Sequence, residues 1–176
     1  MQRVGAGDAA ACSVLVERHL PPIVAFAARM LADRAEAEDV AQETFLRLWR
    51  HAGAWRPRAR LSTWLHRVAY NLCIDRLRRA RPAPLDEAHD PPDPAPDAAA
   101  GLARQQTAAI IAAALAALPE RQRAAIALVH YQELGGSEAA EVLGVGVRAL
   151  ESLLARGRRT LRAELAGRRA ELLGEP

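Results

Sequence analysis

Two carboxylates, Asp39 and Glu43, stand one helical turn apart and could form the paired acid and base of a catalytic site. No nucleophile or histidine accompanies them in the sequence. The two cysteines, Cys12 and Cys73, belong to different predicted helices. The histidines show no close pair at metal-ligand spacing; they are His19, His51, His66, His89 and His130. These observations predict no catalytic residue, no metal and no cofactor, and therefore a protein that is not an enzyme.

Arginine supplies all of the basic charge, because the 24 basic residues include no lysine. Residues 51–81 carry eight arginines against Asp75, and residues 147–169 carry seven against Glu151 and Glu164. Residues 82–97 between them hold five acidic residues and no arginine. Two basic segments separated by an acidic one predict a polyanion contacted at two places. The alternative is that these arginines only form solvated helix faces.

The segment from Trp55 to Arg60 combines an aromatic ring with three arginines in a predicted loop. A guanidinium binds phosphate through paired hydrogen bonds, and tryptophan stacks on bases, so the combination suits single-stranded or distorted nucleic acid. Trp64 falls on the apolar side of the next predicted helix and is expected in the core. For Trp55 two interpretations remain open, a base contact and simple packing.

Helices are the elements that must position these residues. The chain has 40 Ala and 23 Leu and few β-branched residues, which favours an all-α fold. The patterns predict helices over 8–20, 22–32, 35–52 and 61–80, with a break at Pro21-Pro22. Prolines crowd residues 82–97, which predicts an extended, semi-stiff linker. We therefore expect one domain over 1–81, the Pro-rich acidic linker over 82–97, and a second domain over 98–170.

The second domain has the order of a helix-turn-helix. A helix over 98–118 precedes one from Pro119 to about Leu134; Ser137 is expected to cap a short helix that ends before Gly144. A last helix runs from Val147 past Leu165. Its inward positions are predicted to be Val147, Leu150, Leu154 and Leu161, whereas Arg148, Ser152, Arg156 and Arg159 would reach a DNA groove and its phosphates.

The helix over 35–52 has two faces. Its core face is predicted to consist of Ala37, Ala41, Phe45, Leu48 and Ala52. Opposite lie Asp39, Gln42, Glu43, Leu46 and Arg50. This second face fits a docking surface for a basic, partly apolar helix; a solvated face and the carboxylate pair named above are the alternatives. The helix over 61–81 has a predicted apolar stripe of Leu61, Trp64, Leu65, Val68 and Leu72.

Nothing in the sequence indicates membrane insertion. No apolar run approaches the roughly 18 residues that a membrane span needs. The first five residues, MQRVG, do not look like a signal peptide. We expect a soluble, cytoplasmic protein.

Four segments resemble the sigma-70 family of bacterial transcription initiation factors, in particular its small extracytoplasmic-function (ECF) group. Residues 38–49 (EDVAQETFLRLW) look like the core-polymerase-binding segment, and residues 61–79 (LSTWLHRVAYNLCIDRLRR) are similar to the promoter-melting helix. Residues 118–123 (LPERQR) and 137–145 (SEAAEVLGV) resemble the C-terminal DNA-binding domain. The four segments stand in the family's order, and the resemblance extends over nearly the whole chain except the linker.

The resemblance implies a role for each surface: a region 2-like bundle that binds core RNA polymerase and opens the minus-ten element, and a region 4-like domain that reads the minus-thirty-five element as duplex. It also implies promoter DNA and an anti-sigma factor as partners. Polymerase contacts would be Asp39, Gln42, Glu43, Leu46, Arg47 and Trp49. Minus-ten contacts would be Trp55, Arg56, Arg60, Arg67, Asn71, Arg76, Arg78 and Arg79. Minus-thirty-five contacts would be Ser137, Arg148, Ser152, Arg156, Arg158 and Arg159.

The last helix departs from the family pattern. Gly146 stands where a Ser or Thr cap is usual, and Glu151, Leu153 and Ala155 replace commoner basic or larger polar residues. The promoter sequence therefore cannot be read from this helix. An alternative function is a transcriptional regulator that uses the same helix-turn-helix without polymerase and binds an operator by itself.

Overall fold

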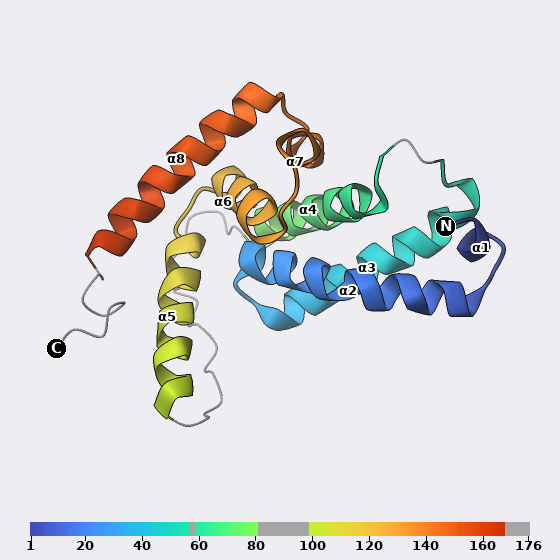
Figure 1. The fold of residues 1–176 in the computed structure, drawn as a ribbon, viewed down its shortest axis with the longest axis horizontal. Coiled ribbons are helices and arrows are strands. Elements are labelled where there is room, and N and C mark those ends of the chain that lie inside the picture. Colours follow the sequence, from blue (N-terminus) through green and yellow to red (C-terminus); the bar gives the residue numbers. More distant parts are fainter. Residues whose placement is uncertain (57–58, 81–98, 168–176) are drawn as a thin grey trace.

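The computed structural model describes residues 1–56, 59–80 and 99–167, with side chains in the last range from residue 106. Every element in these ranges is helical, which confirms the all-α fold (Figure 1). The predicted linker over 82–97 lies outside the described residues. The N-terminal part comprises α1 (Gln2–Gly5), α2 (Ala9–Leu31), α3 (Arg34–His51), the 3₁₀ turn η1 (Ala52–Ala54) and α4 (Leu61–Ala80). The C-terminal part comprises α5 (Ala99–Ala116), α6 (Glu120–Ile126), the π-helical turn η2 (Ala127–Tyr131), α7 (Gly136–Leu143) and α8 (Val147–Ala166).

Helix α2 continues through Pro21 and Pro22, so the predicted break between two helices is wrong. Each proline removes only one backbone donor, and the ring of Pro21 lies on the exposed side. The turns that follow carry fully buried side chains, among them Phe26 and Met30. Packing of these turns against α3 and α4 holds the helix together where its local sequence would end it.

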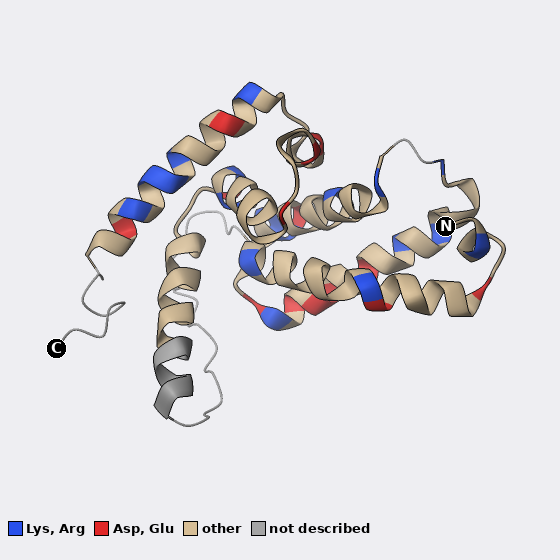
Figure 2. Cartoon of the chain, in the orientation of Figure 1, with Lys and Arg blue, Asp and Glu red and all other residues tan. Residues whose placement is uncertain are grey.

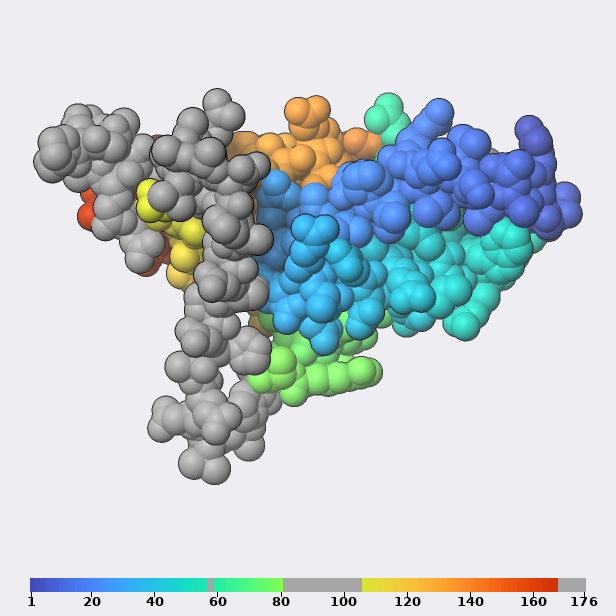
Figure 3. All heavy atoms as spheres, turned by 90° about the horizontal axis from the view of Figure 1, so that it is seen from below, coloured from blue at the N-terminus to red at the C-terminus, as the bar shows by residue number. Residues whose placement is uncertain are grey.

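Helices α2, α3 and α4 pack side by side around the N-terminal core (Figures 1 and 3). Asp33 caps α3 by accepting a hydrogen bond of 3.0 Å from the Glu36 amide. The predicted core face of α3 is confirmed, since Ala37, Ala41, Leu48 and Ala52 are buried and Phe45 packs against the core. The opposite face of α3 is thereby turned outward.

The helix-turn-helix is formed by α7 and α8, joined at Gly144, whose φ of 61° is left-handed and suits glycine. Ser137 does not cap α7: the helix begins at Gly136, and the Glu138 carboxylate accepts from the Gly135 amide at 3.1 Å. Val147 is 47% exposed, so its predicted inward position is wrong. The inward side of α8 consists of Leu150, Leu154 and the buried Gly157, and α6 packs against it.

One described helix, α2, is long and apolar enough to cross a membrane by length and composition alone. Its C-terminal turns pack in the protein core, with Ile23, Phe26, Ala27 and Met30 fully buried. A core helix passes the same test of length and composition, so this helix is weak evidence for a membrane span.

Candidate functional site

The outward face of α3 is the first candidate surface. Leu46 and Trp49 expose 45% and 46% of their surfaces, and Asp39 and Gln42 are also exposed. Trp49 also lines a shallow groove with residues of α2, among them Val16 and Glu17. Large apolar groups that remain exposed beside acidic ones are typical of a surface that binds another protein.

Glu43, on the same face, is held as a carboxylate. The Arg47 Nε donates to its Oε1 at 2.8 Å, one turn further along α3. This hydrogen bond lowers the pKa of Glu43, the opposite of what a general acid needs. The Asp39 and Glu43 pair is therefore better placed for binding than for proton transfer.

An aromatic cluster lies between α3 and α4. The rings of His51 and Trp64 stack with centroids 5.7 Å apart and an interplanar angle of 8°. Trp55 meets both rings edge-on, at 6.3 Å from His51 and 5.6 Å from Trp64. Trp64 packs against the core as predicted, and Trp55 remains half-buried next to the exposed Arg56. The cluster fixes the start of the arginine-rich loop.

The arginines of α4 fall into two groups. Arg67 and Arg79 are exposed, as is Asn71, and Arg78 pairs with Asp75 at 3.1 Å on the surface. Arg76, in contrast, is tied to α3: its Nε lies 2.8 Å from the Glu36 carboxylate and its Nη1 donates to the Glu36 carbonyl at 3.1 Å. Arg76 therefore joins two helices in addition to any contact with a ligand.

The second face of α4 is the residue set that the sequence analysis missed. The predicted apolar stripe is only half-buried apart from Leu65, whereas Thr63, His66 and Tyr70 are 2%, 4% and 8% exposed. They are spaced three and four residues apart, so they share one side of the helix. Their polar character hid this face from a search for apolar periodicity. Their burial follows from tertiary contacts, since α7 packs on α4 and the His66 ring meets Phe26 of α2 edge-on.

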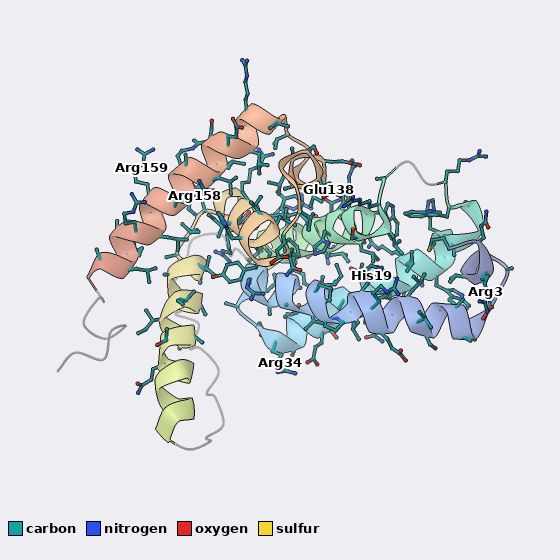
Figure 4. The ribbon with its side chains drawn as sticks, viewed as in Figure 1. Arg3, His19, Arg34, Glu138, Arg158 and Arg159 are labelled. Carbon is teal, nitrogen blue, oxygen red and sulfur yellow. The ribbon has the colours of Figure 1, made fainter. Side chains whose placement is uncertain are left out.

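Helix α8 presents a second basic surface, with arginines recurring along its length (Figure 2). Arg148, Ser152 and Arg156 are exposed and joined in series: the Ser152 hydroxyl donates to the Arg148 carbonyl at 3.0 Å, and Arg156 Nε donates to the Ser152 carbonyl at 3.2 Å. Arg159 is exposed, whereas Arg158 donates to His130 at 3.2 Å; Figure 4 shows the two on different sides of α8. Ser137 is exposed at the start of α7.

The reactive side chains are dispersed. Among the described residues no three His, Cys, Asp or Glu side chains gather as a metal site requires. Burial raises the pKa of the Cys73 thiol to about 12, which removes its reactivity near neutral pH. Cys73 packs as a small apolar residue, as predicted.

Comparison with known families agrees with this arrangement of helices. The model of Sigma-70 region 2 matches residues 15–82, and that of Sigma-70, region 4 matches residues 108–161. The chain belongs to the sigma-70 family of transcription initiation factors. Within it the chain is a member of the extracytoplasmic-function group, as its similarity to individual members shows.

Two of these relatives match most of the chain. The ECF RNA polymerase sigma factor SigM of Mycobacterium tuberculosis is 36% identical over 165 residues, covering 92% of this chain and 80% of the relative. The ECF RNA polymerase sigma factor SigW of Bacillus subtilis is 31% identical over 180 residues, covering 94% of each.

Two solved structures share the fold. CnrH, in complex with the cytosolic domain of CnrY, is 27% identical with a TM-score of 0.73, and the match covers 94% of each chain. The sigma factor RpoE of Bartonella quintana, in complex with the anti-sigma factor NepR, has a TM-score of 0.70 at 23% identity, covering 88% of this chain and 96% of that one.

Proposed function

We propose that this ECF sigma factor binds core RNA polymerase and directs promoter-specific initiation by contacting promoter DNA at two separate elements. The observation that carries the proposal is that one chain holds an exposed apolar and acidic face on α3 together with two exposed arginine-bearing surfaces, on α4 and on α8. The first suits a protein partner and the other two suit a polyanion.

Polymerase docking is assigned to the outward face of α3. Leu46 and Trp49 would supply apolar contacts at its centre, since both are half exposed and large. Asp39, Gln42 and Glu43 would complement basic groups of the partner, and Arg47 would keep Glu43 charged and in place through the 2.8 Å bond.

Recognition of the opened minus-ten element is assigned to the loop before α4 and the exposed side of that helix. Trp55, Arg56 and Arg60 would hold the single strand from the loop, and Arg67 and Asn71 would contact it from α4. Arg78 and Arg79 at the end of α4 would bind phosphates. Arg76 takes part by orienting the helix through Glu36.

Recognition of the minus-thirty-five duplex is assigned to α8. The N-terminal half of α8, the part of a recognition helix that contacts base edges, carries Arg148, Ser152 and Arg156. Arg159, further along the helix, would contact backbone phosphates. Ser137 at the start of α7 would add a backbone contact. Arg158 donates a hydrogen bond to His130 and would therefore be less available to contact DNA.

The remaining assignments follow from the same proposal. Residues 1–81 and 98–170 would act as two domains joined by residues 82–97, in the cytoplasm, without catalytic activity or a cofactor of their own. Because both similar solved structures are complexes, CnrH with CnrY and RpoE with the anti-sigma factor NepR, an anti-sigma factor is the expected inhibitor of this chain.

Reconstituted transcription tests the proposal. Purified chain and core polymerase should give run-off transcripts from promoters selected out of a random library, and core polymerase alone should not. A chain that binds operator DNA but not core polymerase would instead be a regulator of the alternative kind.

Arg156 gives the residue-level test. Arg156→Ala should weaken promoter binding by about 1–3 kcal/mol and relax preference at one position if the side chain reads a base edge. Arg162→Ala, which removes an exposed charge from the same helix, is the matched control. A loss that is equal for all DNA sequences would reduce Arg156 to a phosphate contact.

A further inference from the structure

The N-terminal and C-terminal parts share one cluster of buried apolar residues, which includes Met30 and Leu118, and they also meet through polar groups. Thr63, His66 and Tyr70 are buried on α4, where α7 of the C-terminal part packs, and the His66 ring also meets Phe26 of α2 edge-on. Thr63 Oγ1 lies 3.5 Å from the Glu138 carboxylate, which also pairs with Arg60 at 3.3 Å; Figure 4 labels Glu138 where α7 approaches α4. Interfaces between independently folded units are more polar than a domain core, because both sides must be soluble when apart.

Arg123 of α6 joins the two parts most directly. The residue is 8% exposed, and its guanidinium donates to the Met30 carbonyl of α2, to the Ala116 carbonyl and, at 3.1 Å, to the Leu118 carbonyl. Met30 and Ala116 lie in the last turns of α2 and α5, where backbone carbonyls have no partner within the helix. The cation also lies at the negative end of both helix dipoles.

A contact at the rim supports the same closure. The Arg29 guanidinium of α2 lies 4.1 Å from the centroid of the Tyr131 ring in η2. Tyr131 is 39% exposed, so this cation–π contact can separate without uncovering an apolar core. Arginine contacts to carbonyls, a carboxylate and a ring thus join the N-terminal and C-terminal parts in addition to their shared apolar cluster.

This closed arrangement is too small for the proposed function. The minus-ten and minus-thirty-five elements lie about 25 base pairs apart, or roughly 85 Å along B-form DNA. A compact chain of 176 residues has a radius of gyration of only about 16 Å. The α4 and α8 surfaces cannot reach both elements while the two parts remain packed together.

We propose that Arg123 is a latch that holds the two parts closed, and that its release from the Met30 carbonyl is required before the chain binds both promoter elements. The requirement for opening rests on the proposed function, whereas the closed state that Arg123 holds is a property of the free chain. On opening, water replaces the carbonyl partner of the guanidinium, and Arg60 loses Glu138 and becomes available to nucleic acid.

Distances between spin labels in the full-length chain measure the closure directly. Cysteines at Ala35 of α3 and Ala163 of α8, both exposed, would carry the labels in a Cys12→Ser background. Cys73 can remain, because burial raises its pKa to about 12 and keeps it unlabelled near neutral pH. The free chain should give one narrow distance distribution, and a broad one would overturn the proposal.

Two substitutions of Arg123 test the latch. Arg123→Met keeps an unbranched side chain and removes the donors; it should raise the ratio of open to closed chains at least about tenfold. Arg123→Lys keeps the charge but cannot donate to carbonyls on two helices in a fixed fork, so it should open the chain partially. Arg18→Met, which removes an exposed arginine from α2, should change nothing.

If Arg123→Met is folded by circular dichroism and keeps the wild-type distance, the latch is refuted; if it does not fold, the Arg123→Lys distances decide in the same way. Adding core polymerase and promoter DNA to the wild-type chain should lengthen the distance. If the promoter complex gives run-off transcripts but retains the short distance, the required opening is refuted and sigma-factor function stands. Failure to bind polymerase refutes only the proposed function.

Discussion

Removal of the two large exposed side chains of α3 should weaken binding to core polymerase. Full burial of a leucine is worth about 1.5–3 kcal/mol, so the 45% of Leu46 that remains exposed corresponds to about 1 kcal/mol. A tryptophan buries up to about 250 Å², so the 46% exposed part of Trp49 corresponds to about 2–3 kcal/mol. Leu46→Ala with Trp49→Ala should therefore raise the Kd about a hundredfold or more.

The assay is equilibrium binding of labelled chain to core polymerase without DNA. Val147→Ala is the matched control, because Val147 is an apolar residue of similar exposure (47%) on α8; it should stay within about twofold of the wild type. Asp39→Ala should add a smaller loss that disappears at high salt, as for a charge at the rim of an interface. Wild-type affinity of the double variant, with unchanged helical content, would refute the assignment of this face.

Two further predictions concern stability. A Cβ at Gly157 would lie 3.2 Å from the buried Ile126 side chain, so Gly157→Val should lower the free energy of unfolding by about 1–3 kcal/mol. Gly167→Val is the control, because a Cβ at Gly167 would lie in open space. Equal thermal midpoints of the two variants would contradict the close packing of α8 on α6. Burial lowers the pKa of His66 and of His19 below the ordinary 6.5. Below that pH the unfolded chain therefore binds more protons than the folded chain. The free energy of unfolding should fall as pH falls, by up to about 1.4 kcal/mol per pH unit for each histidine. Urea unfolding at pH 7.5 and 5.5 measures this fall, and His66→Gln should make it smaller; a stability that does not change with pH would show that the folded chain takes up the protons freely.

Helices with one apolar side were predictable from the sequence because their burial follows a single period. In α3 the apolar residues recur every three to four positions, and the side opposite them is exposed with Leu46 at its centre. Glycine at the turn between α7 and α8 was equally predictable, since Gly144 has the left-handed backbone that other residues disfavour. In these elements local preference and tertiary structure agree.

The continuity of α2 was not predictable in this way. Two prolines oppose a helix locally, and the buried turns after them favour one through contacts with α3 and α4, which a local pattern does not contain. Val147 fails for a related reason: its spacing matches the inward side of α8, but it is 47% exposed, whereas the neighbouring helices cover Leu150 three residues further on. Both errors arise because the neighbouring helices decide which positions of a helix are covered.

The burial of Arg123 shows a further limit of reading charge from composition. Among 24 arginines, those of α8 and of the loop before α4 were assigned to a polyanion, and nothing in residue type distinguishes Arg123 from them. Its partners are backbone carbonyls at two helix ends, which every helix has and no residue pattern marks. The same five donors that make arginine a phosphate ligand make it a cap for two helices at once. An arginine can therefore hold this chain closed as well as bind DNA, and only the position of the helix ends separates the two roles.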